Sequence, residues 1–371
     1  MIKRLKTGLA VMLAAFVVFT TGCAASPQES NEPAQPAATE TAQTQEAPKP
    51  VDNQPSSSAP QTPKTVTDAA GREVEIPAHL DTVAITCNGG SHHEVAILGA
   101  ADKVIAMPDA STFPQLLKMI ETYDDVEDAG SFDNVNIEEM VTLDPDFIFV
   151  GISSKETNEK LGEMGFPYYT LYIGWANIDT LKQEFLNVGA ILGNEEKAQE
   201  LYDYWTEKIA MVQDTVAKIP DSERKTVYYI SKDNITSANT GTWTWPLIET
   251  SGGICTVPSG WNGEIDVETV LSWNPDVIIL HSGSKTEEIF SDERITKIPA
   301  IANNEVYVAP TGGFWWDRPS PEAPLAFMWL AKTLYPEYTE NIDLKAETKD
   351  FFARFYDYDL PDAEYEAFFP Q

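Results

Sequence analysis

Two segments of this sequence repeat one pattern at a constant offset of 130 residues. The copies span residues 130–151 and 260–283, and their apolar positions also correspond. The identical positions are Gly130 and Gly260, Glu138 and Glu268, Pro145-Asp146 and Pro275-Asp276, and Ile148 and Ile278. Because one structural unit used twice builds two equivalent packing layers, the repeat predicts two similar α/β lobes.

Each copy predicts a loop, a short helix and then a buried strand. Asn136 and Asp266 are good N-cap residues, because their side chains accept hydrogen bonds from free amides at a helix start. Glu138 and Glu268 follow in the first turn, where the helix dipole favours a negative charge. The shared proline is expected to end each helix, and the apolar run after it predicts a strand covered on both faces.

Further apolar runs supply the remaining strands of the two lobes. Strands are expected at residues 83–86, 104–107, 147–150 and 168–173 of the first lobe, and at 226–230, 277–280 and 306–309 of the second. Between the lobes, residues 178–219 favour helix, with Leu201, Trp205, Ile209 and Val212 recurring at helical spacing. This segment is either a peripheral crossover helix or a long helix that bridges the lobes.

The first 22 residues have the features of an export signal. Lys3, Arg4 and Lys6 precede an apolar run of 13 residues, Gly8 to Thr20, which is too short to span a bilayer comfortably. The run ends just before Cys23, in a segment that resembles a bacterial lipobox, where the cysteine is acylated. An ordinary secretory signal with an incidental cysteine is the alternative. Both predict an extracytoplasmic protein, and the lipobox predicts a lipid anchor in the bacterial membrane, at the cell surface or in the periplasm.

Residues 23–63 predict a disordered tether between this anchor and the folded part of the chain. The segment holds eight of the 25 prolines and no aromatic residue. Such a composition buries too little apolar surface to offset the entropy of ordering the chain.

The composition excludes several classes of function. The chain has 58 Asp and Glu against 25 Lys and Arg, so a net charge of −33 repels nucleic acid and anionic membrane surfaces. Three cysteines cannot build a disulfide scaffold, and four histidines disfavour a His-rich metal site. The sequence has no P-loop, no G-x-G-x-x-G after a strand and no H-E-x-x-H, so neither an enzyme nor a resident cofactor or metal is expected.

From about residue 65 to its end, the chain resembles the extracytoplasmic substrate-binding proteins of ABC importers for iron complexes, haem and cobalamin. The resemblance rests on residues 66–77, residues 98–104, the two Glu…Pro-Asp units and Ser251-Gly-Gly253. It implies an α/β fold of two Rossmann-like lobes with central, mainly parallel sheets, joined by one long α-helix, with ligand in the cleft between them. The implied divisions are a signal peptide (1–22), the tether (23–63), an N-terminal lobe (64–185), a linking helix region (186–222) and a C-terminal lobe (223–371).

The resemblance also implies partners. Glu138 and Glu268 would lie on the exposed tops of the lobes and form salt bridges with arginines of two permease subunits. The alternative is that each glutamate only stabilises the start of its helix. The implied partners are an ABC permease dimer with its ATPase subunits, a small-molecule metal chelate and, through the N-terminal lipid, the membrane. Nucleic acid is not expected, and the protein is expected to be a monomer.

Loops that follow the strands are the candidate ligand-binding surface, because open α/β sheets bind ligands at the carboxyl ends of their strands. The candidates are residues with imidazole, aromatic or guanidinium side chains in these loops: His92, His93, Phe132, Trp243, Trp245, Trp261, Trp316 and Arg318. Tryptophans beside Gly, Thr and Ser favour flat walls for a large ligand, and packing of the loops onto the lobes is the alternative. Arg318 either binds an anion or pairs with the adjacent Asp317.

Imidazoles and thiols leave further alternatives open. His92, His93 and His281 are available to bind the metal of a ligand, or are structural residues. Since His92 and His93 are neighbours, at most one is expected to face the cleft. Cys87 and Cys255 lie in different lobes, so free or buried thiols are expected rather than a disulfide.

Together these features favour a receptor for a metal chelate: a ferric siderophore, haem or a corrinoid. The scarcity of basic residues in the loops argues against a strongly anionic catecholate complex. A small oxyanion such as molybdate, held by Arg318, or a free metal ion is the alternative ligand. A sensory or adhesion lipoprotein is the alternative from another functional class.

Overall fold

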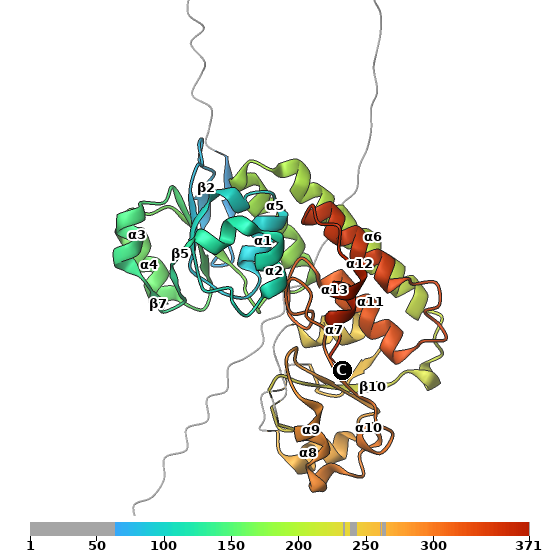
Figure 1. Ribbon diagram of the computed structural model, residues 1–371. Helices are drawn as coiled ribbons and strands as arrows, with labels where there is room; N and C mark the ends of the chain where they lie inside the picture. The colour runs from blue at the N-terminus through green and yellow to red at the C-terminus, as the bar shows by residue number, and fades with distance from the viewer. Residues whose placement is uncertain (1–63, 233, 238–242, 260, 262–264, 371) are drawn as a thin grey trace, which may run out of the picture. The chain divides into compact units, whose positions relative to one another are not determined.

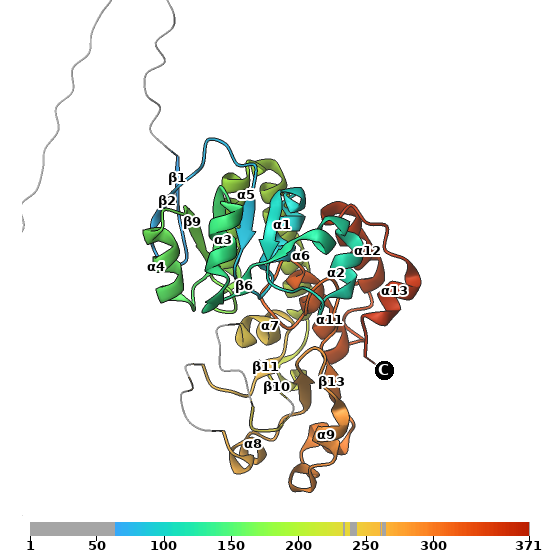
Figure 2. The ribbon, with the colours of Figure 1, turned by 60° about the vertical axis from the view of Figure 1, so that its left-hand side comes forward.

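The computed structural model describes residues 64–232, 234–237, 243–259, 261 and 265–370. These residues form two lobes, each built around a parallel sheet (Figures 1 and 2), as expected for the α/β class. The expected signal segment, the acylated Cys23 and the tether lie outside the described residues. Within the described ranges, no helix combines the length and the apolar character needed to cross a membrane.

The first lobe holds a five-stranded sheet in the order β5-β4-β3-β8-β9, with all neighbours parallel. Its strands are β3 (Val83–Ile85), β4 (Val104–Met107), β5 (Glu127–Asp128), β8 (Phe147–Gly151) and β9 (Tyr168–Leu171). The helices of this lobe are α1 (Ser91–Ile97), α2 (Pro114–Met119), α3 (Ile137–Leu143) and α4 (Lys155–Glu163). Two hairpins are added, β1 (Thr65–Thr67) with β2 (Glu73–Glu75), and β6 (Gly130–Ser131) with β7 (Asn134–Val135). The four predicted strands are confirmed to within two residues at each end.

The second lobe holds a four-stranded parallel sheet in the order β11-β10-β12-β13. Its strands are β10 (Thr226–Ile230), β11 (Ile254–Cys255), β12 (Val277–Leu280) and β13 (Val306–Val308). Its helices are α7 (Thr244–Thr250), α8 (Val267–Trp273), α9 (Thr286–Phe290) and α10 (Pro299–Ala302), followed by α11 (Ala323–Leu334), α12 (Leu344–Phe355) and α13 (Asp362–Ala367). The three predicted strands are confirmed, whereas the two-residue β5 and β11 are too short for a periodic pattern.

Two helices, not one, occupy the segment between the lobes. Helix α5 (Ile178–Leu192) ends at Gly193, whose φ of 74° is left-handed and closes a helix without steric cost. Helix α6 (Glu195–Val216) then runs toward β10, and it packs on α5 and on α11. The bridging helix is therefore α6 alone, because the glycine separates it from the helix that still belongs to the first lobe (Figure 1).

Trp205 of α6 joins the two lobes through their shared apolar core. Its buried ring lies 5.2 Å from the ring of Phe185 in α5 and 6.4 Å from that of Phe327 in α11. Its indole nitrogen donates to the carbonyl of Pro321, 3.0 Å away. One continuous cluster of buried side chains extends from the first sheet through α5 and α6 to α11 and α12. Such a core resists large hinge motion, because opening the lobes widely would expose it.

The repeated helices begin as the sequence predicts. In α3, the Asn136 side chain accepts from the amide of Glu139 at 3.2 Å. In α8, the Asp266 side chain accepts from the amide of Thr269 at 2.7 Å. Each helix ends at a left-handed residue directly before the repeated proline, Asp144 or Asn274. Each helix therefore ends at the residue before the proline, whereas the sequence placed the end at the proline itself.

The repeated aspartate after the proline ties neighbouring strands together. Asp146 Oδ2 accepts from the amide of Thr82 at 2.9 Å and from its hydroxyl at 3.1 Å. Asp276 Oδ2 accepts from the same two groups of Thr226, at 2.8 and 2.7 Å. Each aspartate therefore anchors the start of one strand to the start of the next, which accounts for its presence in both copies.

Candidate functional site

Loops at the carboxyl ends of the strands bring the two lobes into contact. Phe113, after β4, lies 4.9 Å from Phe314 and 5.0 Å from Trp315, both in the loop after β13. The ring of His93 lies 4.8 Å from that of Phe314. The loops predicted to line the cleft thus do meet, through an aromatic cluster contributed by both lobes.

The two neighbouring histidines of α1 are buried in this contact. His93 Nε2 donates to the carbonyl of Gly313, so the neutral ring carries its proton on Nε2. Both ring nitrogens of His92 lack a hydrogen-bond partner among the described residues. Burial lowers the pKa of His92 to about 4 and holds the pKa of His93 well below its usual range. In this structure both imidazoles are neutral packing groups.

A polar cluster centred on Asp317 lies at the carboxyl ends of the second sheet. The buried carboxylate accepts from His281 Nδ1 and from the Ser282 hydroxyl, each at 2.7 Å, and from the hydroxyl of Tyr229. Arg318 Nε lies 3.6 Å away. Burial opposes ionisation, but the hydrogen bond and charge of His281, with Arg318 and Ser282, lower the pKa of Asp317 to about 2. Asp317 is therefore a fixed negative charge.

Asp317 orients His281 toward solvent. Because Nδ1 donates a hydrogen bond to the carboxylate, the neutral form of the ring has the lone pair on Nε2. The side chain is 19% exposed, and the described residues offer Nε2 no hydrogen bond. The ring of Trp315 lies edge-on at 5.0 Å. His92 and His93 also have ring nitrogens without a hydrogen-bond partner among the described residues, but these are fully buried, whereas the His281 side chain is partly exposed.

Arg318 pairs with Asp317, which is one of the two alternatives that the sequence left open. Its ion pair with Asp317 uses Nε, and its side chain is 30% exposed. Among the described residues the guanidinium donates no hydrogen bond, so the group keeps donors for an anion.

The predicted tryptophans divide into two groups. Trp243 is buried between Trp205 and Phe327, and Trp316 is buried with its indole nitrogen 2.9 Å from Glu322 Oε2. These two pack the core and have no surface for a ligand wall in this structure. The neighbour of Trp316, Trp315, instead has its ring 5.0 Å from that of His281.

The other predicted aromatic residues are half-buried. Trp245 donates to the carbonyl of Val257 at 3.0 Å, and the ring of Trp261 lies 5.6 Å from that of Trp273. Both pack on the apolar core of the second lobe. Phe132 lies at the strand ends of the first lobe, where its amide donates to Thr86 at 2.8 Å. The hydrogen bonds and ion pair of Asp317 described above involve Tyr229, His281, Ser282 and Arg318 rather than these three aromatic residues.

Glu138 and Glu268 are exposed in the first turns of α3 and α8. One turn further along, each helix exposes an apolar residue at an equivalent repeat position. Val141 is 55% exposed and Leu271 is 38% exposed. Residues three apart lie on one helix face, so each lobe presents the same acidic and apolar pair.

The two cysteines of the described chain are free. Burial raises the pKa of Cys87 to about 12 and that of Cys255 to about 11. Both thiols are therefore protonated and unreactive at neutral pH, in agreement with the expectation of free or buried thiols.

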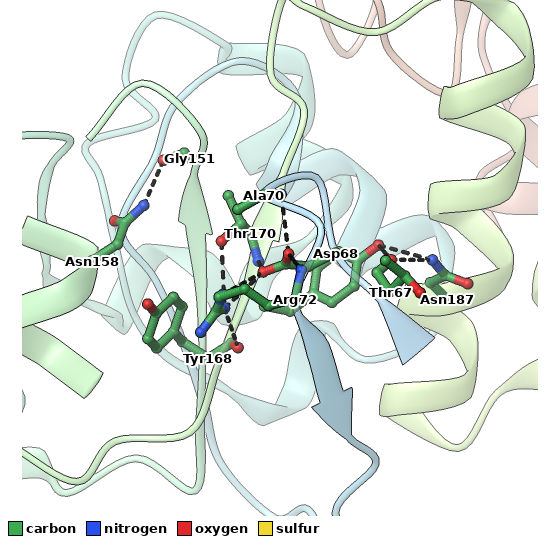
Figure 3. Close-up of polar contacts among 10 residues, drawn as sticks. Thr67, Asp68, Ala70, Arg72, Gly151, Asn158, Tyr168, Thr170 and Asn187 are labelled. Atoms are coloured by element: carbon green, nitrogen blue, oxygen red, sulfur yellow. Dashed lines mark hydrogen bonds and ion pairs between the residues drawn. The ribbon is translucent and has the colours of Figure 1, made fainter. Parts of the chain in front are cut away.

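A surface pocket of about 370 Å³ lies on the first lobe beside β9 (Figure 3). Arg72 lines it, but its guanidinium makes two hydrogen bonds to Asp68 and stacks 3.7 Å above the ring of Tyr168. Asp68 also accepts from the amide of Thr170 at 3.2 Å. The Asp-Ala-Ala-Gly-Arg segment thus fixes the β1–β2 hairpin on β9. Its two charged side chains pair with each other in this contact.

The model of the periplasmic binding protein family matches residues 85–311. The chain belongs to this family. It is the solute-binding component of an ABC transporter, and the family is non-catalytic and extracytoplasmic.

Two curated relatives cover most of the family domain. The molybdate-binding protein MolA of Haemophilus influenzae is 22% identical over 79% of this chain and 91% of its own length. The ABC transporter substrate-binding lipoprotein YvrC of Bacillus subtilis is 24% identical over 74% of this chain and 86% of its own.

Solved structures share the fold. A periplasmic solute-binding protein from Veillonella parvula is 24% identical, with a TM-score of 0.71 over 83% of this chain and 97% of that one. The molybdate-bound MolA of Haemophilus influenzae is 21% identical, with a TM-score of 0.70 over 80% of this chain and 99% of that one. At these identities the likeness defines the fold and leaves the ligand open.

Proposed function

We propose that this solute-binding protein captures a metal chelate and that His281 Nε2 binds the metal. The supporting observation is the hydrogen bond from His281 Nδ1 to the buried Asp317. Metal-binding histidines commonly donate their second nitrogen to a carboxylate, which fixes the tautomer and the direction of the lone pair. Haem, a corrinoid, or a ferric siderophore whose own donors leave a coordination position open has a metal centre that accepts such a ligand.

Two neighbours suit the remainder of a chelate. The exposed donors of Arg318 fit a carboxylate group at its edge, and the indole of Trp315 supplies an apolar face. The cluster lies in loops at the carboxyl ends of the second sheet, and this end of the strands is where open α/β sheets bind ligands.

A spectroscopic titration tests the proposal. Purified protein is titrated with haemin, cobinamide and a ferric hydroxamate, and absorption is recorded from the near ultraviolet to the visible. We expect one chelate to saturate, with the shift of its metal bands lost and the affinity reduced at least about tenfold in His281→Ala. His79→Ala, a change at an exposed histidine, is the matched control and should behave as wild type. Equal spectra for His281→Ala and wild type would contradict the role of His281.

Molybdate is the second candidate. Arg318 and a protonated His281 are two adjacent donors for an oxyanion, and one of the two curated relatives named above is a molybdate-binding protein. Saturable binding of molybdate that is lost in Arg318→Ala, with no response to any chelate, would support this ligand instead.

We also propose that Glu138 and Glu268 dock the receptor on its permease. The repeat gives the two lobes equal patches, each an exposed glutamate followed one turn later by Val141 or Leu271. Two equal patches suit a pair of related permease subunits, with arginines opposite the glutamates.

Uptake by cells tests this docking. The double variant Glu138→Ala with Glu268→Ala should abolish uptake of the bound probe and leave its affinity for the purified protein unchanged. Glu156→Ala with Glu287→Ala is a matched control, because these exposed glutamates occupy the first turns of α4 and α9. Normal uptake by the first pair would contradict docking through Glu138 and Glu268.

Anchoring through Cys23 remains a proposal from the sequence. The curated relative named as a lipoprotein supports it. Cys23→Ala should move the protein from the membrane fraction to the soluble exported fraction, and labelled fatty acid should be incorporated only by the wild type.

A further inference from the structure

We propose that a small buried cavity between the lobes binds one dehydrated Ca²⁺ ion. Three chain segments line the cavity: residues 89–94 of the first lobe, residues 173–184 around the start of α5, and residues 319–321 of the second lobe. Its lining includes neither Asp317, His281 nor Arg318, and no ligand proposed above involves it.

Two carboxyl groups face this cavity without a cation. Glu94 is 4% exposed, and its Oε1 has no hydrogen-bond partner among the described residues. Glu184, also buried, accepts from the amide of Tyr172 at 2.7 Å. No lysine or arginine of the described ranges forms an ion pair with either one. An uncompensated pair of buried carboxylates is costly, so a proton or a cation must accompany them.

An independent group from the second lobe completes the cavity. Ser320 is 1% exposed, and its hydroxyl also lacks a partner among the described residues. Ser320 lines the same cavity as the two glutamates. Native proteins seldom leave buried hydroxyl and carboxyl oxygens unpaired, so their convergence indicates a bound species.

The size and chemistry of the cavity select the species. Its volume is about 10 Å³, which is roughly the space of one water molecule. The donors are oxygens, which suit a hard cation rather than Zn²⁺ or Cu²⁺. The described residues contain no group of three His, Cys, Asp or Glu that could hold a metal ion, so the cavity offers two carboxylates and no third acidic ligand. Mg²⁺ retains several waters, for which there is no room, whereas Ca²⁺ accepts irregular oxygen ligands without them. Main-chain oxygens of the lining segments would supply the remaining ligands.

Without the ion, the two acids must hold protons. Burial raises the pKa of Glu184 to about 8, and burial and the Glu184 charge raise the pKa of Glu94 well above its usual range. A divalent cation would remove the need for these protons. Because Ser320 belongs to the second lobe and both glutamates to the first, the ion would also strengthen the contact between lobes.

Thermal unfolding of the purified protein, treated with EGTA and dialysed, tests the proposal at pH 8. We expect 1 mM CaCl₂ to raise the Tm of the wild type by about 3 °C, and MgCl₂ to have a much smaller effect. Glu184→Gln and Glu94→Gln should abolish the shift, and calorimetry should show Ca²⁺ affinity reduced at least tenfold. Glutamine keeps an acceptor for Tyr172, so these variants are expected to fold, which circular dichroism checks.

The chain is strongly acidic, so surface binding of Ca²⁺ needs a control. Glu287→Gln with Glu288→Gln removes two exposed carboxylates from α9 and should retain the full shift. Ser320→Ala should weaken binding by about threefold. Absence of a shift in the wild type would overturn the proposal and leave a water and shared protons in the cavity. An equal shift in wild type and Glu184→Gln would overturn it as well.

Discussion

Asp317 and the Glu94–Glu184 pair are buried carboxyl sites with opposite properties. Asp317 accepts hydrogen bonds from Tyr229, His281 and Ser282, and its pKa is lowered to about 2. Of the two glutamates, only Glu184 accepts a hydrogen bond, from the amide of Tyr172, and the pKa values of both are raised. Burial is common to both sites, so the number of donors around each carboxylate decides whether it is charged.

This difference separates two kinds of site in one protein. A carboxylate whose donors are already in place is a rigid support, and here it orients His281 and Arg318. A carboxyl pair with only one donor requires a proton or an ion to offset its burial. Four predictions test this contrast.

The largest expected effect is a loss of stability with rising pH from the glutamate pair. The folded pKa values lie above the unfolded value of 4.5, so the folded state binds more protons and its contribution is complete below pH 4.5. In EGTA, the free energy of unfolding should fall between about pH 4.5 and 8. Urea unfolding measures it, and Glu94→Gln with Glu184→Gln should flatten this part of the curve. A curve of unchanged slope in the double variant would show that these groups do not control it.

Asp317→Asn should have the next largest effect. It removes the charge that accepts from three side chains, and we expect a loss of about 3 kcal/mol in the free energy of unfolding at pH 7. Asp292→Asn is the control, since Asp292 pairs with the exposed Arg294 and should change stability much less. Equal losses in the two variants would refute the supporting role of Asp317.

Acid unfolding should show Asp317 with the opposite sign to the glutamates. Its folded pKa of about 2 lies below the unfolded 3.8, so it contributes about 2 kcal/mol above pH 4. This contribution should disappear as the pH falls from about 4 to about 2. The wild type should lose more stability over this range than Asp317→Asn, and parallel curves would contradict the assignment.

Glu322 is the intermediate case and should give the smallest effect. It is buried, which raises its pKa to about 7, while donors from Tyr356 and Trp316 oppose the rise. At pH 6 it is largely protonated, so Glu322→Gln should change the free energy of unfolding by less than about 1 kcal/mol. A loss of several kcal/mol in urea unfolding would indicate an ionised carboxylate.

Much of the fold could be predicted because its signals are local. A few neighbouring residues are enough to identify the helix caps at Asn136 and Asp266 and the apolar runs of seven strands. The division of the linking segment at Gly193 was not predicted, since a glycine in a helical pattern marks either an end or an interior position.

Much less of the candidate site could be predicted. Adjacent tryptophans have the same local signal, yet Trp315 contacts His281 whereas Trp316 packs in the core. His92 and His93 resemble His281 as sequence, but they lie in a buried helix and have no orienting carboxylate. The sequence indicates Asp317 only as a partner of the adjacent Arg318, because nothing near it in sequence marks it as the acceptor for Tyr229 and His281.

Local features of the chain are enough to predict two α/β lobes, their repeated helices and strands, and the resemblance to the receptor family. These depend on periodicity, capping and turns, which neighbouring residues specify. Which buried polar groups find hydrogen-bond partners depends on the tertiary structure. Glu184 lies 90 residues from Glu94, and Asp317 lies 88 residues from Tyr229 and 36 from His281. Only folding brings such residues together, and it sets the donors and burial on which their charge depends.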